Sequence, residues 1–143
     1  MAQSTAQAQW SGDLTGGRGS IDRVGSGKFG PLDVTWAARI GDDSDLTTPE
    51  ELLAAAHAAC YSMALSNILA KQGTPPTRVS TSATVTFVPG TGITTSALTV
   101  EGDVPGVDDA TFQKAAEEAR DGCPVSGALK GNVALSVDAR LVS

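Results

Sequence analysis

The sequence has few aromatic residues, few cysteines and almost no histidine, and each shortage narrows the functions that the protein can have. Aromatic residues make up 4% of the 143 residues, so a packed core has to be built mainly from Ala, Val, Leu and Ile. One histidine, His57, and two cysteines, Cys60 and Cys123, are too few ligands for a zinc site within one subunit. A Ser-His-Asp triad would have to use His57. We therefore expect a protein without a bound metal.

Basic residues are also in the minority. The chain has 10 Lys and Arg residues against 16 Asp and Glu residues, which gives a formal net charge of −6. An acidic domain repels the phosphate backbone, so nucleic-acid binding is not expected as the main function.

Targeting and membrane signals are missing from the sequence as well. Residues 1–7 (MAQSTAQ) contain neither a basic nor an apolar run, and the most apolar stretch, residues 52–69, is interrupted by polar side chains. We expect that stretch to be a buried helix, without membrane contact, in a cytoplasmic protein. In that reducing compartment the two cysteines are expected to be free or catalytic.

The hydrophobic pattern predicts a single α+β domain over residues 1–143. We expect the order βββ-α-ββ-α-α-β, with mainly antiparallel sheets around a long central helix. The predicted strands are residues 7–10, 19–24, 32–40, 79–88, 93–104 and 133–141, and the predicted helices are residues 49–72, 109–120 and 124–129. The strands 79–88 and 93–104 are expected to form an antiparallel hairpin.

Two of these elements carry further expectations. In residues 32–40 the apolar residues alternate with others, which predicts that Arg39 points away from the face of Trp36. The long helix begins with Thr48 as its cap, Pro49 at its first position and Glu51 completing a capping box. It is apolar on most of its circumference, so we expect it to be buried on several sides.

The two cysteines occupy different kinds of position. Cys60 lies in the middle of the long helix, where the helix dipole is weak, so a thiolate there needs a cation from elsewhere. Otherwise Cys60 is a small buried hydrophobic residue. Cys123 precedes Pro124 at the start of a short helix, a placement that lowers a thiol pKa, although a structural role is equally open. Only the fold could bring the two thiols together.

Glu50, Glu51 and His57 also have competing interpretations. Both glutamates fall in the first turn of the long helix, where the dipole alone favours carboxylates. On one straight helix Glu50 lies about 15 Å from Cys60, so a shared site would need two antiparallel helices in a twofold dimer. His57 shares a helix face with Cys60, but without an orienting carboxylate nearby a packed core histidine is favoured over a Cys-His dyad.

The residues around both cysteines resemble a known family. Residues 49–65 read PEELLAAAHAACYSMAL and residues 122–126 read GCPVS, and these are similar to the two cysteine motifs of the osmotically inducible protein C (OsmC) family. The segments 8–14 (AQWSGDL), 15–19 (TGGRG) and 47–50 (TTPE) are also similar to that family. The resemblance covers essentially the whole chain in order and length.

This resemblance implies a thiol-dependent peroxidase with an intertwined homodimeric α+β fold and active sites at the subunit interface. It implies that Cys60, Cys123, Arg39 and Glu50 are the catalytic residues, with no bound cofactor. The sequence resembles the OsmC branch more than the organic hydroperoxide resistance (Ohr) branch. Arg39 is therefore favoured as the cation beside Cys60, and Arg18 is the alternative because it resembles the arginine of the Ohr branch.

The implied reaction reduces organic hydroperoxides, and hydrogen peroxide less well, to alcohols in oxidative or osmotic stress. Arginine oriented by Glu50 favours the Cys60 thiolate, which attacks the peroxide and becomes a sulfenic acid. Cys123 then forms a disulfide with Cys60, and an external dithiol, expected to be of the lipoyl type, reduces it. A pocket lined by Ala, Leu and Met residues of the long helix would favour organic substrates.

Two other functions remain open at this point. A non-redox acyl transferase or hydrolase would use Cys60 with His57 and would not need Cys123. A non-enzymatic binding module connected with stress would have cysteines that only fill the core.

Overall fold

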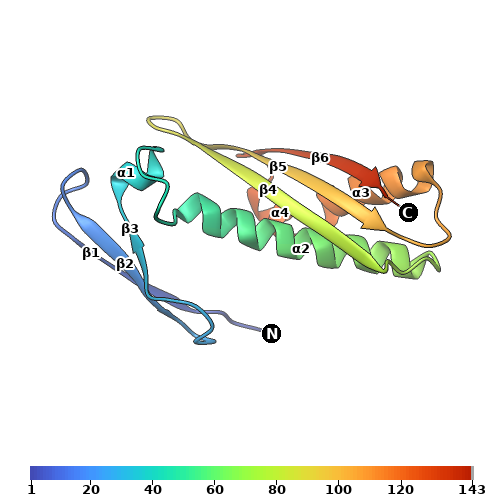
Figure 1. Ribbon diagram of the computed structural model, residues 1–143, viewed down its shortest axis with the longest axis horizontal. Coiled ribbons are helices and arrows are strands. Elements are labelled where there is room, and N and C mark those ends of the chain that lie inside the picture. Colours follow the sequence, from blue (N-terminus) through green and yellow to red (C-terminus); the bar gives the residue numbers. More distant parts are fainter. Residues whose placement is uncertain (143) are drawn as a thin grey trace. The chain divides into compact units, whose positions relative to one another are not determined.

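The computed structural model describes residues 1–142 (Figure 1). The residues form two compact units, Met1–Leu52 and the chain from Leu53 onward. The boundary falls within the first turn of the longest helix, and each unit is described by itself. The prediction of a single domain over residues 1–143 stays a prediction.

The first unit contains a small antiparallel sheet and a short helix. Its strands β1 (Ala6–Ser11), β2 (Arg18–Val24) and β3 (Leu32–Val34) follow the order β1-β2-β3. The three strands predicted near the start of the chain are therefore present.

The third of these strands is much shorter than predicted. After Val34 the chain turns into helix α1 (Trp36–Arg39), because the Thr35 hydroxyl accepts a hydrogen bond from the Ala38 N–H at 3.1 Å. The prediction that Arg39 points away from the face of Trp36 is wrong for this reason. Residues three apart on a helix share a side, and both Trp36 and Arg39 line the same cleft.

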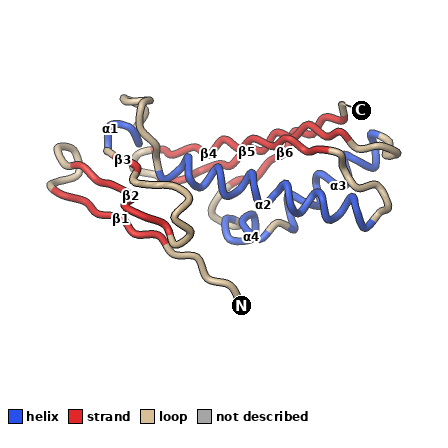
Figure 2. The backbone as a smooth tube through the Cα atoms, turned by 60° about the horizontal axis from the view of Figure 1, so that its bottom comes forward, coloured by secondary structure: helices blue, strands red, loops and turns tan. Residues whose placement is uncertain are grey.

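The second unit consists of helices on one side of a three-stranded sheet. It holds most of α2 (Pro49–Lys71), followed by β4 (Arg78–Val88), β5 (Gly92–Asp103), α3 (Asp109–Gly122), α4 (Pro124–Leu129) and β6 (Ala134–Leu141). In Figure 2 the helices α2, α3 and α4 all lie on the same side of the β4-β5-β6 sheet.

Most predicted features of this unit are confirmed. Strands β4 and β5 form the expected antiparallel hairpin. The Asp108 carboxylate caps α3 by accepting from the Thr111 N–H at 2.8 Å, and Pro124 begins α4. Strand β6 pairs parallel to β5, since the crossover through α3 and α4 returns the chain in the same direction.

Helix α2 is buried on one face only, which contradicts the expectation of burial on several sides. Its buried residues recur at every fourth position and pack with β5 and α3 in the core: His57, Tyr61, Leu65 and Leu69. The opposite face includes Met63, which is 73% exposed. Helix α2 is also long and apolar enough to cross a membrane, as core helices of soluble proteins often are.

Candidate active site

The second unit brings the two cysteines together. They lie 63 residues apart in the sequence, yet their Sγ atoms are 3.0 Å apart, which is within hydrogen-bond distance. Both are free thiols; Cys123 is buried and Cys60 is half-buried. The pair joins the middle of α2 to the junction of α3 and α4.

The chain direction at Cys123 follows from its neighbours. Helix α3 ends at Gly122, and the Cys123 N–H donates to the Ala119 carbonyl at 3.0 Å. Pro124 cannot continue that ladder but suits the first position of a new helix. Cys123 is therefore held at the start of α4, as the sequence predicted.

The two thiols have opposite pKa shifts. Burial raises the pKa of Cys60, as does the hydrogen bond with Cys123, and the Val125 N–H offsets only part of this. Burial also disfavours the Cys123 thiolate, but hydrogen bonds from Cys60 and Ser126 prevail and lower the pKa of Cys123. Within this unit Cys60 thus still needs the cation that its position in mid-helix implies.

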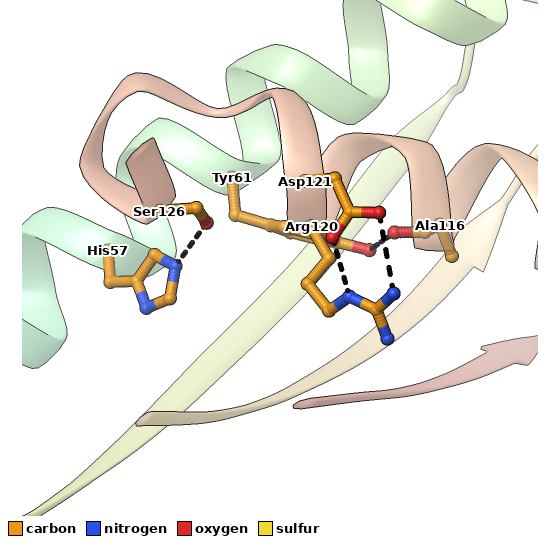
Figure 3. Close-up of polar contacts among 6 residues, drawn as sticks. All are labelled: His57, Tyr61, Ala116, Arg120, Asp121 and Ser126. Carbon is orange, nitrogen blue, oxygen red and sulfur yellow. Dashed lines mark hydrogen bonds and ion pairs between the residues drawn. The ribbon is translucent and has the colours of Figure 1, made fainter. Parts of the chain in front are cut away.

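His57 is a buried histidine held by two serine hydroxyls. Its Nδ1 lies 2.6 Å from Ser96 Oγ. Its Nε2 lies 2.8 Å from Ser126 Oγ, the contact drawn in Figure 3. Burial lowers the pKa of His57, so the ring is neutral at neutral pH. Because both ring nitrogens already have partners, the geometry favours the packed histidine over a base for Cys60.

The residue after Cys60 anchors α2 to α3. The Tyr61 hydroxyl donates to the Ala116 carbonyl at 2.9 Å, and burial raises the pKa of this phenol (Figure 3). Near the end of α3, Arg120 forms an ion pair with Asp121 at 3.1 Å. The Tyr61 contact joins α2 to α3, whereas the Arg120–Asp121 pair lies within α3.

The first unit pairs the other two predicted catalytic residues. The Glu50 Oε1 atom accepts from Arg39 Nε at 2.9 Å and lies 2.8 Å from a terminal guanidinium nitrogen. Glu50 is 5% exposed, and its Oε2 atom has no hydrogen-bond partner within residues 1–142. A guanidinium so held is a fixed positive charge on the last residue of α1.

Arg18, the alternative arginine, is placed differently. It begins β2 with an exposed side chain, and its guanidinium has no hydrogen bond or ion pair with any residue in the described range. Of the two arginines, Arg39 is therefore the one that a carboxylate orients.

An apolar cleft lies beside Arg39 in the first unit. Its lining consists of Trp10, Gly12, Leu14, Val34, Thr35, Trp36, Arg39 and Pro49. The Trp10 indole lies so close to Gly19 that a Cβ there would come within 2.5 Å of the ring. The Trp10 Nε1–H donates to the carbonyls of Gly12 and Asp13 at 3.2 and 3.1 Å. Trp10 is thus a fixed wall of the cleft.

The serines around His57 and the aromatic wall of the cleft were not among the residues that the sequence predicted for the site. Ser126 could have been found, because it is the third residue of a helix capped by Cys123. Ser96 lies on β5, and nothing in its spacing from His57 indicates their contact. Among the described residues no group of three or more His, Cys, Asp and Glu side chains could hold a metal ion.

Comparisons with known proteins agree on one family. The family model of OsmC-like protein matches residues 41–138. Peroxiredoxin OsmC of Escherichia coli K12 is 41% identical over 132 residues, which cover 90% of this chain and 91% of that protein. An organic hydroperoxide resistance protein of Xanthomonas axonopodis pv. citri is 34% identical over 96 residues, or 65% of this chain and 66% of that protein. The solved structure of an organic hydroperoxide resistance protein from Elizabethkingia anophelis has a similar fold, with a TM-score of 0.70, 24% identity and 96% of both chains covered.

Proposed function

Since this chain belongs to the OsmC-like protein family, we propose that it is a thiol-dependent peroxidase that reduces organic hydroperoxides through Cys60 and Cys123. The observation that carries this proposal is the contact of their two Sγ atoms at 3.0 Å. A sulfenic acid formed on either sulfur would have the other thiol beside it. This is the arrangement that a peroxidase with a disulfide intermediate needs.

In the proposed reaction Cys60 is the thiol that attacks the peroxide. Its thiolate attacks one peroxide oxygen, the O–O bond breaks, and the alcohol leaves after taking a proton. Arg39, oriented by Glu50, supplies the positive charge that lowers the free energy of this thiolate. Cys123 then displaces hydroxide from the sulfenic acid to give the disulfide and water.

We further propose that the active protein is a homodimer with its sites at the subunit interface. Glu50 and Cys60 are too far apart on one helix to meet, so a second subunit has to bring them together. The exposed apolar face of α2 supports this proposal, since a second copy of the chain would cover it. The active protein then needs no bound cofactor.

The organic part of the substrate is assigned to the cleft beside Arg39. The sequence led us to expect Ala, Leu and Met residues of α2 in such a pocket. Leu65 and Leu69 are fully buried in the core, whereas Met63 is exposed, so this expectation stays a prediction. The two tryptophans of the chain line the cleft beside Arg39. An aryl or alkyl group packed against the indole rings gains binding energy that hydrogen peroxide cannot gain.

A cytoplasmic location and an external dithiol of the lipoyl type complete the proposal. A reducing compartment keeps both cysteines as thiols between turnovers. A dithiol opens the Cys60–Cys123 disulfide by two successive exchange steps and itself becomes a cyclic disulfide. Defence against oxidative or osmotic stress is the role that fits this chemistry.

The acyl transferase and the binding module are distinguished by variants. We expect Cys60→Ala to abolish hydroperoxide consumption. We expect Cys123→Ser to consume about one equivalent and then stop, because the sulfenic acid is not recycled. An acyl transferase would retain its turnover of thioesters in Cys123→Ser, and a binding module would not consume hydroperoxide at all. Either result would contradict the proposed peroxidase function and support the corresponding alternative.

A matched substrate series tests the cleft. We expect cumene hydroperoxide to react with a lower KM than hydrogen peroxide. Trp10→Ala should raise the KM for cumene hydroperoxide and leave the KM for hydrogen peroxide unchanged. Equal KM values for both substrates in the unaltered protein would contradict the assignment of the cleft.

A further inference from the structure

A chain of buried polar side chains in the second unit has no role in the reaction described so far. Ser96, His57 and Ser126 have exposed fractions of 0%, 0% and 1%, and hydrogen bonds of 2.6 and 2.8 Å join them through the imidazole. Buried polar groups are costly unless every member is satisfied. The other buried residues of this unit are mostly apolar, so three hydrogen-bonded polar side chains among them call for an explanation.

The series of hydrogen bonds leads to the helix turn that begins at Cys123. Cys123 is the residue before α4 and Ser126 is the third residue of that helix, so the two side chains belong to the same first turn. The Ser126 side chain lowers the pKa of Cys123, which is the effect of a hydroxyl that donates toward the sulfur. Ser126 therefore lies between the imidazole of His57, to which it is hydrogen-bonded (Figure 3), and the turn that carries the thiol proposed to form the disulfide.

The direction of these hydrogen bonds follows from counting protons. The Ser126 hydroxyl has one proton, so when it donates to Cys123 it has to accept from the Nε2–H of His57. A neutral imidazole with its proton on Nε2 accepts on Nδ1, where the Ser96 hydroxyl lies. All donors then point along one direction, from Ser96 toward the sulfur of Cys123.

We propose that His57 is a positioning residue for the second step: by donating to Ser126 it directs the Ser126 hydroxyl to Cys123 and holds that sulfur as the nucleophile. The role rests on the proposed peroxidase reaction. The S–S bond forms as the S–O bond of the Cys60 sulfenic acid breaks. The hydroxide that leaves and the proton from the Cys123 thiol make one water molecule. Ser126 and His57 keep their protons throughout.

Few other titratable groups lie near this sulfur. Cys60 and Tyr61 come from α2, and both interact with Cys123 electrostatically. The end of α3 adds the Arg120–Asp121 pair, and Lys130 follows α4 near Asp121. Because burial raises the pKa of Tyr61, the only tyrosine, its ionisation does not overlap that of a thiol.

A single-turnover experiment separates the two steps. Reduced protein is mixed with one equivalent of cumene hydroperoxide, and hydroperoxide loss and disulfide formation are followed separately. In Ser126→Ala we expect an unchanged rate of hydroperoxide loss and about tenfold slower disulfide formation, the effect of one lost hydrogen bond to a charged group. The sulfenic acid should then persist long enough to be trapped with dimedone.

Variants of His57 test whether it acts through Ser126. His57→Leu removes the donor and should slow disulfide formation as Ser126→Ala does. His57→Gln keeps a side-chain N–H at the place of Nε2 and should restore most of the rate. Ser62→Ala is the matched control on α2, because the Ser62 hydroxyl has other hydrogen-bond partners, the Ala58 carbonyl and Thr81. Disulfide formation at the unaltered rate in His57→Leu would overturn the role of His57.

A second readout does not depend on peroxidase activity. In a Cys60→Ala background the ultraviolet absorbance of the remaining thiolate gives the pKa of Cys123. We expect Ser126→Ala and His57→Leu to shift this titration to higher pH, and Ser62→Ala to leave it in place. An unshifted titration would overturn the proposal even if the protein consumes hydroperoxide. A shifted one without hydroperoxide consumption would leave the hydrogen-bond chain intact and reject the peroxidase instead.

Discussion

At the scale of single residues, Glu50 shows how a buried charge can serve orientation. One carboxylate oxygen of Glu50 receives both close contacts from Arg39, and the other is buried without a partner among the described residues. A buried oxygen without a partner costs stability, so this ion pair is not explained by a contribution to the stability of the fold. A role in orienting the guanidinium of Arg39 explains it better.

Replacement of this carboxylate should affect activity more than stability. In Glu50→Gln we expect kcat/KM for cumene hydroperoxide to fall at least about tenfold, since Arg39 loses its charged partner. The free energy of unfolding should change by less than about 1 kcal/mol, because Arg39 is one-third exposed and solvent screens the pair. Steady-state kinetics and urea unfolding measure the two effects. Glu51→Gln, in the same helical turn but exposed, is the control and should retain activity.

The buried His57 makes a second prediction, on acid stability. Its pKa is lowered by burial from the usual 6.5, so on acidification the unfolded chain binds a proton before the folded chain does. Its contribution to stability is complete above pH 6.5 and is lost as the pH falls below that value. We expect the unfolding midpoint in urea to decrease between neutral pH and about pH 5. In His57→Gln this decrease should be smaller, and an equal decrease would show that other groups cause it.

At the scale of elements, local signals predicted those elements whose ends carry capping residues. Thr48 and Asp108 accept hydrogen bonds from the third residue of α2 and α3 respectively, and both helices begin where the sequence predicted. The β4-β5 hairpin alternates over its length as expected. Helix α1 was missed because residues 32–40 alternate in polarity by chance, while Thr35 acts as a cap within that run.

The cap of α1 is expected to control the position of Arg39. Thr35→Ala removes the hydrogen bond to the Ala38 N–H and should cost about 1 kcal/mol of stability. It should also lower kcat/KM, since Arg39 is the last residue of this short helix. Thr35→Ser keeps the hydroxyl and should retain both properties. Urea unfolding and steady-state kinetics of the unaltered protein and both variants measure these effects. An unchanged kcat/KM in Thr35→Ala would show that the cap of α1 does not control the position of Arg39.

At the scale of the whole molecule, the sequence alone could name the catalytic candidates but not their neighbours. The contact of Cys60 with Cys123 depends on how α3 and α4 pack on α2, which no local spacing encodes. The exposed face of α2 shows what a hydrophobic pattern leaves open. An apolar circumference indicates that a helix is covered, but it does not tell whether the same chain or another subunit covers it.

A mixed dimer tests whether the site is shared between subunits. In the proposal Cys60→Ala is inactive and Glu50→Gln is strongly impaired, but a dimer of one with the other contains one site in which both residues are intact. Unfolding the two variants together in equal amounts and refolding them should restore about a quarter of the unaltered activity, because half of the dimers are mixed and each has one intact site of two. Activity no higher than the sum of the two variants would place Glu50 and Cys60 in the same chain's site or make them independent.

The disulfide between Cys60 and Cys123 is the central claim, and intact mass tests it most directly. Fully reduced protein is mixed with one equivalent of an organic hydroperoxide, and mass and free thiols are measured within seconds. We predict that both thiols disappear and that each chain becomes lighter by two hydrogens, with peptide mapping linking Cys60 to Cys123. Thiols that survive an excess of hydroperoxide, or a chain that only gains oxygen, would contradict the account.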